Sequence, residues 1–262
     1  MQSIDSHLDL RLSDYKLLKT KEENTDFFIA DNEKTAIRLL QSDFKIKSVF
    51  CLPKYFQKHE DLIRLRLKEM SYCFVAEKSV FESTIGYSIH QGFMAIGYKK
   101  WAELDELTSS HVLFNAIADS ENIGSMIRSC VALGMKSLVF DSQCSPPYLR
   151  RSVRVSMGSI FSAKIVLTED IKYFIENQKQ KGFKIIALSL PREGSKFQNI
   201  TKSLYDFIKV DKFILIVGNE ADGIDLEYLS LADEILYIPM KNQIDSLNVS
   251  HALAIALSHI LR

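Results

Sequence analysis

The 262-residue chain has little cysteine, proline or glycine and no excess of charge of either sign. With only four cysteines, five prolines and ten glycines, a disulfide-stapled secreted fold, a collagen-like repeat and long disorder are all disfavoured. The 33 basic residues are balanced by 33 acidic ones, which argues against a polycation that binds nucleic acid through bulk charge. A nucleic-acid partner is not excluded, because a local basic patch would suffice.

Sites that depend on clustered ligands are also missing. The cysteines form no C-x-x-C pair and lie in or beside apolar runs, so we expect reduced, partly buried thiols. Among the six histidines only His251 and His259 are close, with no carboxylate between them, and we expect no metal site. No apolar stretch approaches 18 residues, and the N-terminus lacks the pattern of a signal peptide. We therefore expect a cytoplasmic protein with no membrane segment.

The hydrophobic pattern predicts two α/β domains. In the first hundred residues it predicts strands at 26–30, 47–52, 72–76 and 92–98 and helices at 34–40 and 55–70. A polar stretch at 99–111 is typical of a linker. We therefore expect a small α/β domain at 1–105 and a second domain at 106–262.

The second domain has the clearer alternation. Strands are predicted at 112–116, 137–140, 160–167, 184–188, 213–217 and 234–238, and helices at 122–133, 169–181, 202–208, 225–231 and 247–261. Short apolar strands separated by helices indicate a mostly parallel sheet covered on both faces. The last helix is apolar on all sides at 252–257, so we expect it to be buried in the core.

Three segments of this domain carry more information than the fold requires. The first is N-x-G-x-x-x-R, in which Asn122 and Arg128 are about 120° apart on a helix and can border one cleft. The alternative is a solvated helix face capped by Asp119 or Ser120. The second is V-G-N-E-A-D-G, a strand running into a loop that starts at Gly218. It matches neither a dinucleotide-binding nor a P-loop fingerprint, and an ordinary turn is its alternative.

The third segment joins I-P-M to S-L-N-V-S at the start of the last helix. Its polar side chains either belong to a site or cap the helix, with Ser246 or Asp245 as the expected cap. Taken together, the order and spacing of the three segments resemble the SpoU (TrmH) family of RNA ribose 2′-O-methyltransferases over residues 110–262. Residues 1–105 more loosely resemble the ribosomal-protein-like α/β domain of many members, although Asp31 and Asn32 replace the usual Glu-Gly.

The resemblance implies a SPOUT-type catalytic domain with a C-terminal trefoil knot, a homodimer, and S-adenosylmethionine as cofactor. The family's cofactor contacts correspond to Gly218, Ile238 and Leu247. Its catalytic or active-site polar positions correspond to Asn122, Arg128, Glu220, Ser246 and Asn248.

The expected chemistry is compatible with these residue types. Methyl transfer from a sulfonium is an in-line displacement that needs alignment and loss of the hydroxyl proton, but no metal. The family account gives Arg128 the role of proton acceptor. Because a guanidinium stays protonated in proteins, we consider phosphate binding and stabilisation of the developing alkoxide at least as consistent.

A basic run follows, with three arginines within five residues: Arg150, Arg151 and Arg154. We expect these to contact RNA phosphates, with a solvated face as the alternative. The sequence thus favours S-adenosylmethionine-dependent 2′-O-methylation of structured RNA, ribosomal RNA ahead of transfer RNA. The alternative outside the enzymes is a catalytically inactive RNA-binding assembly factor. A small-molecule methyltransferase is disfavoured, since it would not need an RNA-type N-terminal domain.

Overall fold

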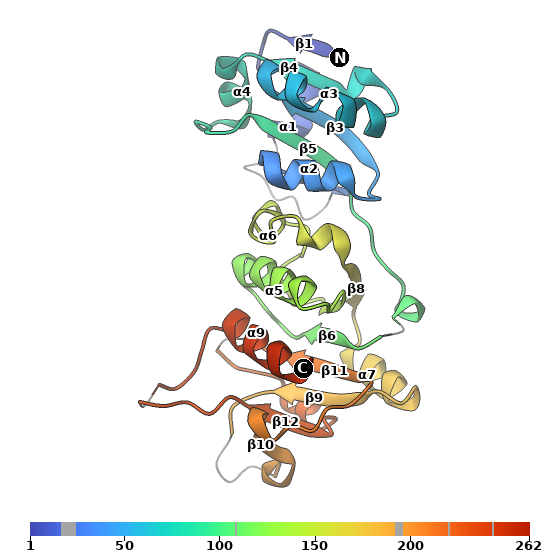
Figure 1. Cartoon of the computed structure of the whole chain (residues 1–262), viewed down its shortest axis with the longest axis vertical. Coiled ribbons are helices and arrows are strands. Elements are labelled where there is room, and N and C mark those ends of the chain that lie inside the picture. The colour runs from blue at the N-terminus through green and yellow to red at the C-terminus, as the bar shows by residue number, and fades with distance from the viewer. Residues whose placement is uncertain (17–24, 108, 192–195, 220, 243) are drawn as a thin grey trace. The chain divides into compact units, whose positions relative to one another are not determined.

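The computed structural model describes residues 1–16, 25–107, 109–191, 196–219, 221–242 and 244–262 (Figure 1). It divides the chain into two compact units, the first made of Met1–Lys100 with Pro146–Ser162 and the second of Trp101–Ser145 with Ala163–Arg262. The first boundary falls inside the polar stretch expected to be a linker. The second piece of the first unit differs from the expected division, which placed residues 146–162 in the second domain.

The first unit is built on a mixed sheet. Its described strands have the order β1-β4-β3-β5-β2, with bounds Gln2–Ile4, Cys73–Ala76, Ile46–Cys51, Phe93–Tyr98 and Phe27–Ala30 respectively. β4 pairs in parallel with β1 and β3, whereas β5 pairs antiparallel with β3 and β2. The helices of the first hundred residues are α1 (Ser13–Lys16), α2 (Glu33–Gln41), α3 (Pro53–Arg66) and α4 (Lys78–Ile85). The hydrophobic pattern predicted α2 and α3 but missed α1, α4 and β1.

Local sequence explains where these helices begin and end. Asn32 caps α2, because its side chain accepts a hydrogen bond from the backbone N–H of Thr35 at 3.0 Å. α3 starts at Pro53, whose missing N–H costs nothing in the first turn. α4 ends at Gly86, which has a φ of 80° and closes the helix in a left-handed conformation.

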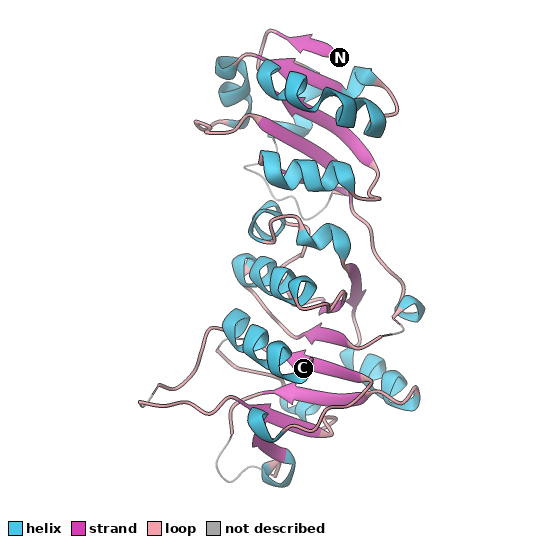
Figure 2. Cartoon of the chain, in the orientation of Figure 1, coloured by secondary structure: helices cyan, strands magenta, loops and turns pink. Residues whose placement is uncertain are grey.

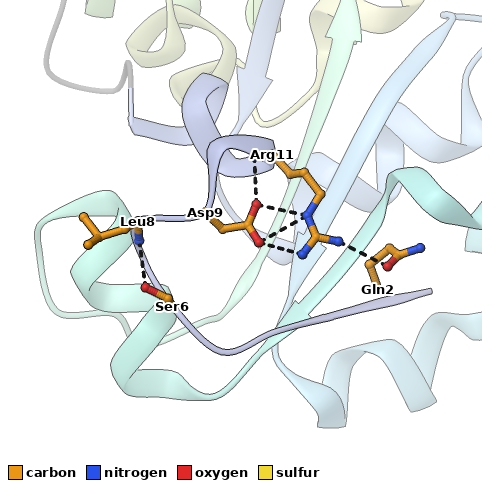
Figure 3. A network of polar contacts seen from close by, with 5 residues as sticks. All are labelled: Gln2, Ser6, Leu8, Asp9 and Arg11. Atoms are coloured by element: carbon orange, nitrogen blue, oxygen red, sulfur yellow. Dashed lines mark hydrogen bonds and ion pairs between the residues drawn. The ribbon is translucent and has the colours of Figure 1, made fainter.

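A polar network links the beginning of the chain to the residues that follow it (Figure 3). Arg11 Nη2 lies 2.6 Å from Asp9 Oδ2, and Arg11 Nη1 donates to Gln2 Oε1 at 3.1 Å. The hydrogen bonds from Arg11 lower the pKa of Asp9 to about 2. The segment that follows β1 is thereby held beside that strand through Gln2.

Residues 146–162 complete the core of the first unit. They contain α6 (Arg150–Val155) and a short 3₁₀ helix, η6 (Ser159–Ser162). The buried ring of Tyr148 stacks on Phe28 with a centroid distance of 5.2 Å, and Phe161 stacks on the same ring at 5.5 Å. Tyr148 Oη also donates to the carbonyl of Lys100 at 2.6 Å. Because these aromatic side chains bury each other, residues 1–100 do not form a complete core by themselves.

The second unit has an entirely parallel sheet among its described strands (Figure 2). The strand order is β10-β12-β9-β11-β6-β7-β8, with bounds Thr201–Ser203, Glu234–Tyr237, Lys184–Leu188, Phe213–Val217, His111–Phe114, Ser137–Asp141 and Lys164–Thr168. Its α-helices are α5 (Ser120–Ala132), α7 (Ile171–Gln180), α8 (Leu226–Leu229) and α9 (Val249–Ile260). α5 and α9 pack against each other. The predicted α/β class with a mostly parallel sheet is confirmed.

Three predictions for this unit were wrong in detail. The helix expected at 202–208 is the short strand β10 followed by a 3₁₀ turn, η8 (Leu204–Asp206). The strand expected from residue 160 begins only at Lys164. α9 is not buried on all sides, because His251 and Ile255 lie on an exposed face while Leu253 and Leu257 are buried. An apolar composition therefore did not imply burial within this chain.

The first residue of β6, His111, predicts a pH dependence of stability. The ring is fully buried between Phe174 and Phe183, and Nδ1 lies 2.8 Å from the carbonyl oxygen of Ser109, to which its N–H donates. Burial lowers the pKa of His111 from 6.5 to about 4. Between these two values the unfolded chain binds a proton that the folded chain does not, so this contribution to stability is complete above pH 6.5 and is lost towards pH 4.

We therefore expect His111 to account for about 2 kcal/mol of stability lost between pH 7 and pH 5. Urea unfolding at both pH values should show this loss in the native protein, and a correspondingly smaller loss in His111→Asn. An identical pH dependence in the two proteins would contradict the assignment.

Candidate functional site

A pocket of about 430 Å³ lies at the carboxyl ends of three adjacent strands in the second unit. Residues following β9, β11 and β12 form its walls, together with the segment before α9 and the first turn of that helix. The carboxyl edge of a parallel sheet is where α/β proteins usually bind ligands. The three positions expected to contact a cofactor all line this pocket: Gly218, Ile238 and Leu247.

Gly218 stands where the chain leaves β11 and turns back on itself. A Cβ atom at this position would lie 2.5 Å from the carbonyl carbon and oxygen of Gly223 and from the backbone nitrogen of Ile224. The same turn is closed by the N–H of Gly223, which donates to the carbonyl of Asn219 at 2.9 Å. Asn219 Nδ2 in turn donates to the carbonyl of Ala116 at 2.8 Å. Glycine at 218 therefore permits a tight loop that forms one wall of the pocket.

Replacing Gly218 with Ala should distort this wall. Because the contacts of the added methyl group are with backbone atoms, we expect a loss of about 1–3 kcal/mol in stability and at least tenfold weaker ligand binding at the pocket. Calorimetry with S-adenosylmethionine and urea unfolding measure the two effects. Gly134→Ala is the matched control, since Gly134 has open space around it and only its φ of 90° opposes the change; it should lose stability but keep binding. Equal binding by both variants would contradict this interpretation.

A buried polar network, which sequence reasoning missed, fixes the neighbouring strand ends. Asn115 Nδ2 and the N–H of Ala116 both donate to Asp141 Oδ2 at 2.9 Å. Asp141 Oδ1 accepts from the N–H of Cys144 at 2.8 Å, and Asn115 Oδ1 accepts from the N–H of Asp225 at 3.2 Å. The network joins the ends of β6 and β7 to the loop beyond β11. A polar residue at the end of an apolar strand, as at Asn115 and Asp141, was the available signal, but it does not show that the two side chains meet.

Two predicted polar residues meet where α5 and α9 begin. Asn248 is the N-cap of α9, and its Nδ2 donates to Oδ1 of Asn122, in the first turn of α5, at 3.0 Å. Asp119, one of the two caps named in the alternative interpretation of this segment, caps α5 by accepting from the N–H of Glu121 at 2.6 Å. The expectation that Ser246 or Asp245 caps the last helix was wrong, since α9 begins later and Asn248 takes that role. Asn248 lies between two residues that line the pocket, Leu247 and Val249.

The remaining predicted catalytic positions differ in what surrounds them. Ser246 lines the pocket in an exposed segment. Arg128 is exposed on α5, and the described residues place no carboxylate within ion-pair distance of it. Glu220 lies outside the described residues.

The three arginines expected to contact RNA belong to the first unit. Arg150 is largely engaged within the protein: its Nε donates to Asp31 Oδ2 at 2.7 Å, and its guanidinium lies 5.3 Å from the centre of the Tyr87 ring. The Asp31 side chain is only 2% exposed. Arg154 is exposed, 3.8 Å from the same carboxylate, and Arg151 is also exposed. A basic run that appeared uniform in sequence thus has one arginine turned inward, a difference the sequence did not indicate.

Comparison with known proteins agrees with this geometry. Residues 109–258, more than half of the chain, match the model of the SpoU rRNA methylase family. The chain belongs to this family. In this SpoU-family chain the matched region contains the described strands of the parallel sheet. The mixed-sheet first unit is built from residues 1–100, which precede the matched region, and from residues 146–162, which lie within it.

Named relatives of this SpoU-family chain include full-length ones. A Bacillus subtilis protein, the 23S rRNA (guanosine(2553)-2′-O)-methyltransferase RlmP, is 27% identical over 262 residues, covering 99% of both chains. A Streptomyces viridochromogenes 23S rRNA (uridine(2479)-2′-O)-methyltransferase is 30% identical over 154 residues, covering 58% of this chain and 52% of the relative. The crystal structure of an AdoMet-bound rRNA methyltransferase from Sinorhizobium meliloti has the same fold, with a TM-score of 0.84, 21% identity, and coverage of 99% and 97%.

Two other features, a cluster of metal ligands and a membrane-spanning helix, are not found among the described residues of this SpoU-family chain. No group of three or more His, Cys, Asp or Glu side chains there is placed to hold a metal ion. None of the helices in the same residues is long and apolar enough to cross a membrane.

Proposed function

We propose that this SpoU-family protein is a cytoplasmic enzyme that methylates the ribose 2′-oxygen of ribosomal RNA with S-adenosylmethionine as methyl donor. The observation that carries the proposal is the pocket at the ends of β9, β11 and β12, with the Asn122–Asn248 pair beside it. The full-length likeness to a 23S rRNA 2′-O-methyltransferase supports ribosomal RNA as the substrate class.

The pocket residues fit S-adenosylmethionine in size and chemistry. A volume of about 430 Å³ is within the usual range for small-molecule sites. Apolar side chains such as Val217, Ile238 and Leu247 suit the adenine ring, while Asp222 and Asp245 bring carboxylates suited to hydroxyl and cationic groups. When bound, S-adenosylmethionine would supply an electrophilic methyl group to a ribose oxygen: the methyl–sulfur bond breaks and its electron pair stays on the sulfur as the new C–O bond forms, and the hydroxyl proton is released to water.

The side chains on α5 and α9 then act on the RNA. Arg128 offers an exposed, permanently charged guanidinium to a backbone phosphate and to the negative charge that develops on the 2′-oxygen. Asn122 and Asn248 supply amide groups at the adjoining helix ends, and Ser246 supplies a hydroxyl at the pocket. Glu220, which follows β11 in the sequence, belongs to the proposed set as well.

We assign RNA capture to the first unit, as an RNA-binding α/β domain. Arg151 and Arg154 are exposed and suited to phosphate contacts, whereas the contacts of Arg150 with Asp31 and Tyr87 make it a structural residue. A domain that reads a folded RNA by shape is what a ribosomal RNA substrate would require.

Two further properties complete the proposal. The C-terminal segment passes through a loop of the second unit as a trefoil knot, which is consistent with its sharing one pocket with the loops beyond β9 and β11. The protein is a homodimer, supported by the exposed Ile255 on α9, a helix whose residues 252–257 are all apolar. Sedimentation of the full chain would measure the oligomeric state, and a monomer at micromolar concentration would contradict this part.

The decisive experiment maps ribose methylation. Ribosomal RNA from cells lacking this gene is incubated with the protein, with and without S-adenosylmethionine, and 2′-O-methyl groups are located by their resistance to alkaline cleavage. We expect one new protected site that requires the methyl donor. Protection of transfer RNA instead would change the substrate. No protection, together with no binding of S-adenosylmethionine in calorimetry, would leave an RNA-binding assembly factor.

A further inference from the structure

Ala116, two residues beyond the end of β6, has a backbone conformation that a residue with a Cβ atom rarely adopts. Its φ of 54° lies in the left-handed region, which favours glycine. Both backbone groups of Ala116 are held by side chains from other parts of the second unit. Its N–H donates to Asp141 Oδ2 at 2.9 Å, and its carbonyl accepts from Asn219 Nδ2 at 2.8 Å. The surrounding structure therefore imposes this conformation on Ala116.

The amide of Asn219 can meet Ala116 in only one way. Asn219 Oδ1 accepts from the backbone N–H of Ala221 at 2.8 Å, and because a backbone N–H can only donate, this end of the amide must be the oxygen. The other end is then the NH₂ group, which donates to the carbonyl of Ala116. Asn219 and Ala221 both line the pocket. The beginning of the pocket wall beyond β11 is thus fastened to Ala116.

Asn115 fastens the other end of the same wall. Its Oδ1 accepts from the backbone N–H of Asp225, the N-cap of α8, at 3.2 Å. Its Nδ2 donates at 2.9 Å to Asp141 Oδ2, the oxygen that also accepts from Ala116. Asp141 is only 4% exposed and is not among the described residues that line the pocket. One buried carboxylate therefore holds two neighbouring residues, each of which is bonded to one end of the segment between Asn219 and Asp225.

We propose that Asp141 is a positioning residue for S-adenosylmethionine binding, which acts on the pocket from outside it through Asn115 and Ala116. The inference rests on the proposed function. Residues of the held segment, Asp222 and Gly223 among them, line the pocket, so a shift at either end moves the wall. A pocket that is held in its binding geometry before the ligand arrives binds more tightly, because ordering a loop on binding weakens the affinity.

Asn219→Asp tests the contact with Ala116 at nearly constant shape. The carboxylate still accepts from Ala221, but it cannot donate to the carbonyl of Ala116 and repels that oxygen. We expect the affinity for S-adenosylmethionine in calorimetry to fall about tenfold, the effect of one lost hydrogen bond. The added negative charge alone would favour a cationic sulfonium, so positioning and charge predict changes of opposite sign. An unchanged or higher affinity would overturn the proposal.

Asp141→Ala removes the carboxylate that supports both ends of the segment. We expect the affinity for S-adenosylmethionine to fall by more than about tenfold, since more than one hydrogen bond is lost. Ala116→Gly in the same background should recover about threefold of this loss, because glycine adopts a φ of 54° without steric cost. A protein that is only destabilised would gain nothing from a more flexible residue. No recovery would therefore contradict transmission through Ala116.

Asp233→Ala is the matched control for the removal of a carboxylate. Asp233 Oδ2 accepts from the N–H of Ile185 at 2.8 Å, near the amino end of β9, whereas the pocket lies at the carboxyl ends of the strands. We expect this variant to lose stability and to keep its affinity for S-adenosylmethionine. Equal losses of affinity in Asp141→Ala and Asp233→Ala would overturn the proposal.

Amide hydrogen exchange of the full chain tests the same link without a ligand. The N–H of Gly223 donates to the carbonyl of Asn219 at 2.9 Å, inside the held segment. We expect this N–H to exchange about tenfold faster in Asn219→Asp and in Asp141→Ala, and at the native rate in Asp233→Ala. Unchanged exchange in Asn219→Asp would overturn the proposal, even if Asp141→Ala failed to fold. If the native protein binds no S-adenosylmethionine, the proposed function fails, and the exchange experiment still decides whether Asp141 holds the segment.

Discussion

Asp31→Asn is expected to lower the free energy of unfolding of the first unit by about 3 kcal/mol, because it leaves the largely buried Arg150 guanidinium without a counter-charge. The native carboxylate lies 2.7 Å from Arg150 Nε and 3.8 Å from Arg154 Nη1. Breaking a buried ion pair from one side costs far more than the intact pair contributes, because the remaining charge stays desolvated. Urea unfolding followed by circular dichroism would measure the change.

The matched control for this experiment is Asp43→Asn. Asp43 also pairs with a cation, Lys100, but both side chains are more than half exposed, and such pairs contribute about 0–1 kcal/mol. We expect its stability to stay close to that of the native protein. If the two variants lose the same stability, the Asp31–Arg150 contact does not anchor residues 146–162, and Arg150 returns to the set of RNA-contacting arginines.

Arg128→Ala is expected to reduce kcat for RNA methylation by about 100–1,000-fold, the usual effect of removing one group that stabilises a developing oxyanion. Arg128→Lys keeps the positive charge but loses the planar fork, so we expect it to recover only part of the rate. Single-turnover methylation with saturating RNA would isolate the chemical step.

The pH profile of Arg128→Lys separates the two roles considered for this residue. A lysine loses its proton more easily than an arginine does. If residue 128 accepts the hydroxyl proton, the lysine variant should gain activity relative to the native enzyme as pH rises from 8 to 10. If residue 128 stabilises charge, as proposed, it should lose activity over this range. Lys172→Ala removes an exposed charge on α7 and should leave the rate unchanged. A near-native rate in Arg128→Lys at neutral pH would exclude any role for the guanidinium's fork.

Much of the second unit could be predicted because its apolar runs in the sequence are also the segments that are buried in the folded sheet. The predicted bounds of β9 and β11 agree residue for residue with the structure. β11 is a continuous run of buried apolar side chains, and β9 has a buried apolar centre at 185–187, so composition alone locates both strands. Gly218 and Ile238 were found as motif residues, and they lie on one pocket because the carboxyl ends of adjacent parallel strands must come together.

The features that sequence did not predict depend on partners far away in the chain. In the sequence Arg150 is one of three arginines that look equivalent. Only the fold shows that it donates a hydrogen bond to Asp31, 119 positions earlier. The cap of α9 was misplaced because Asp245, Ser246 and Asn248 are all acceptable caps, and the contact with Asn122 helps to distinguish them. For the same reason the network of Asn115 and Asp141 was missed, since neither residue is informative without the other.

The return of residues 146–162 to the first unit has a consequence for how this protein can be divided. The chain passes between the units three times, at 100–101, 145–146 and 162–163. No single cut in the gene separates them, and a fragment ending at Lys100 would lack the Tyr148 and Phe161 rings that cover Phe28. An exchange of the first unit between relatives must carry two gene segments together. The first unit is therefore a discontinuous module, and substitutions in one of its two segments must remain compatible with the other segment.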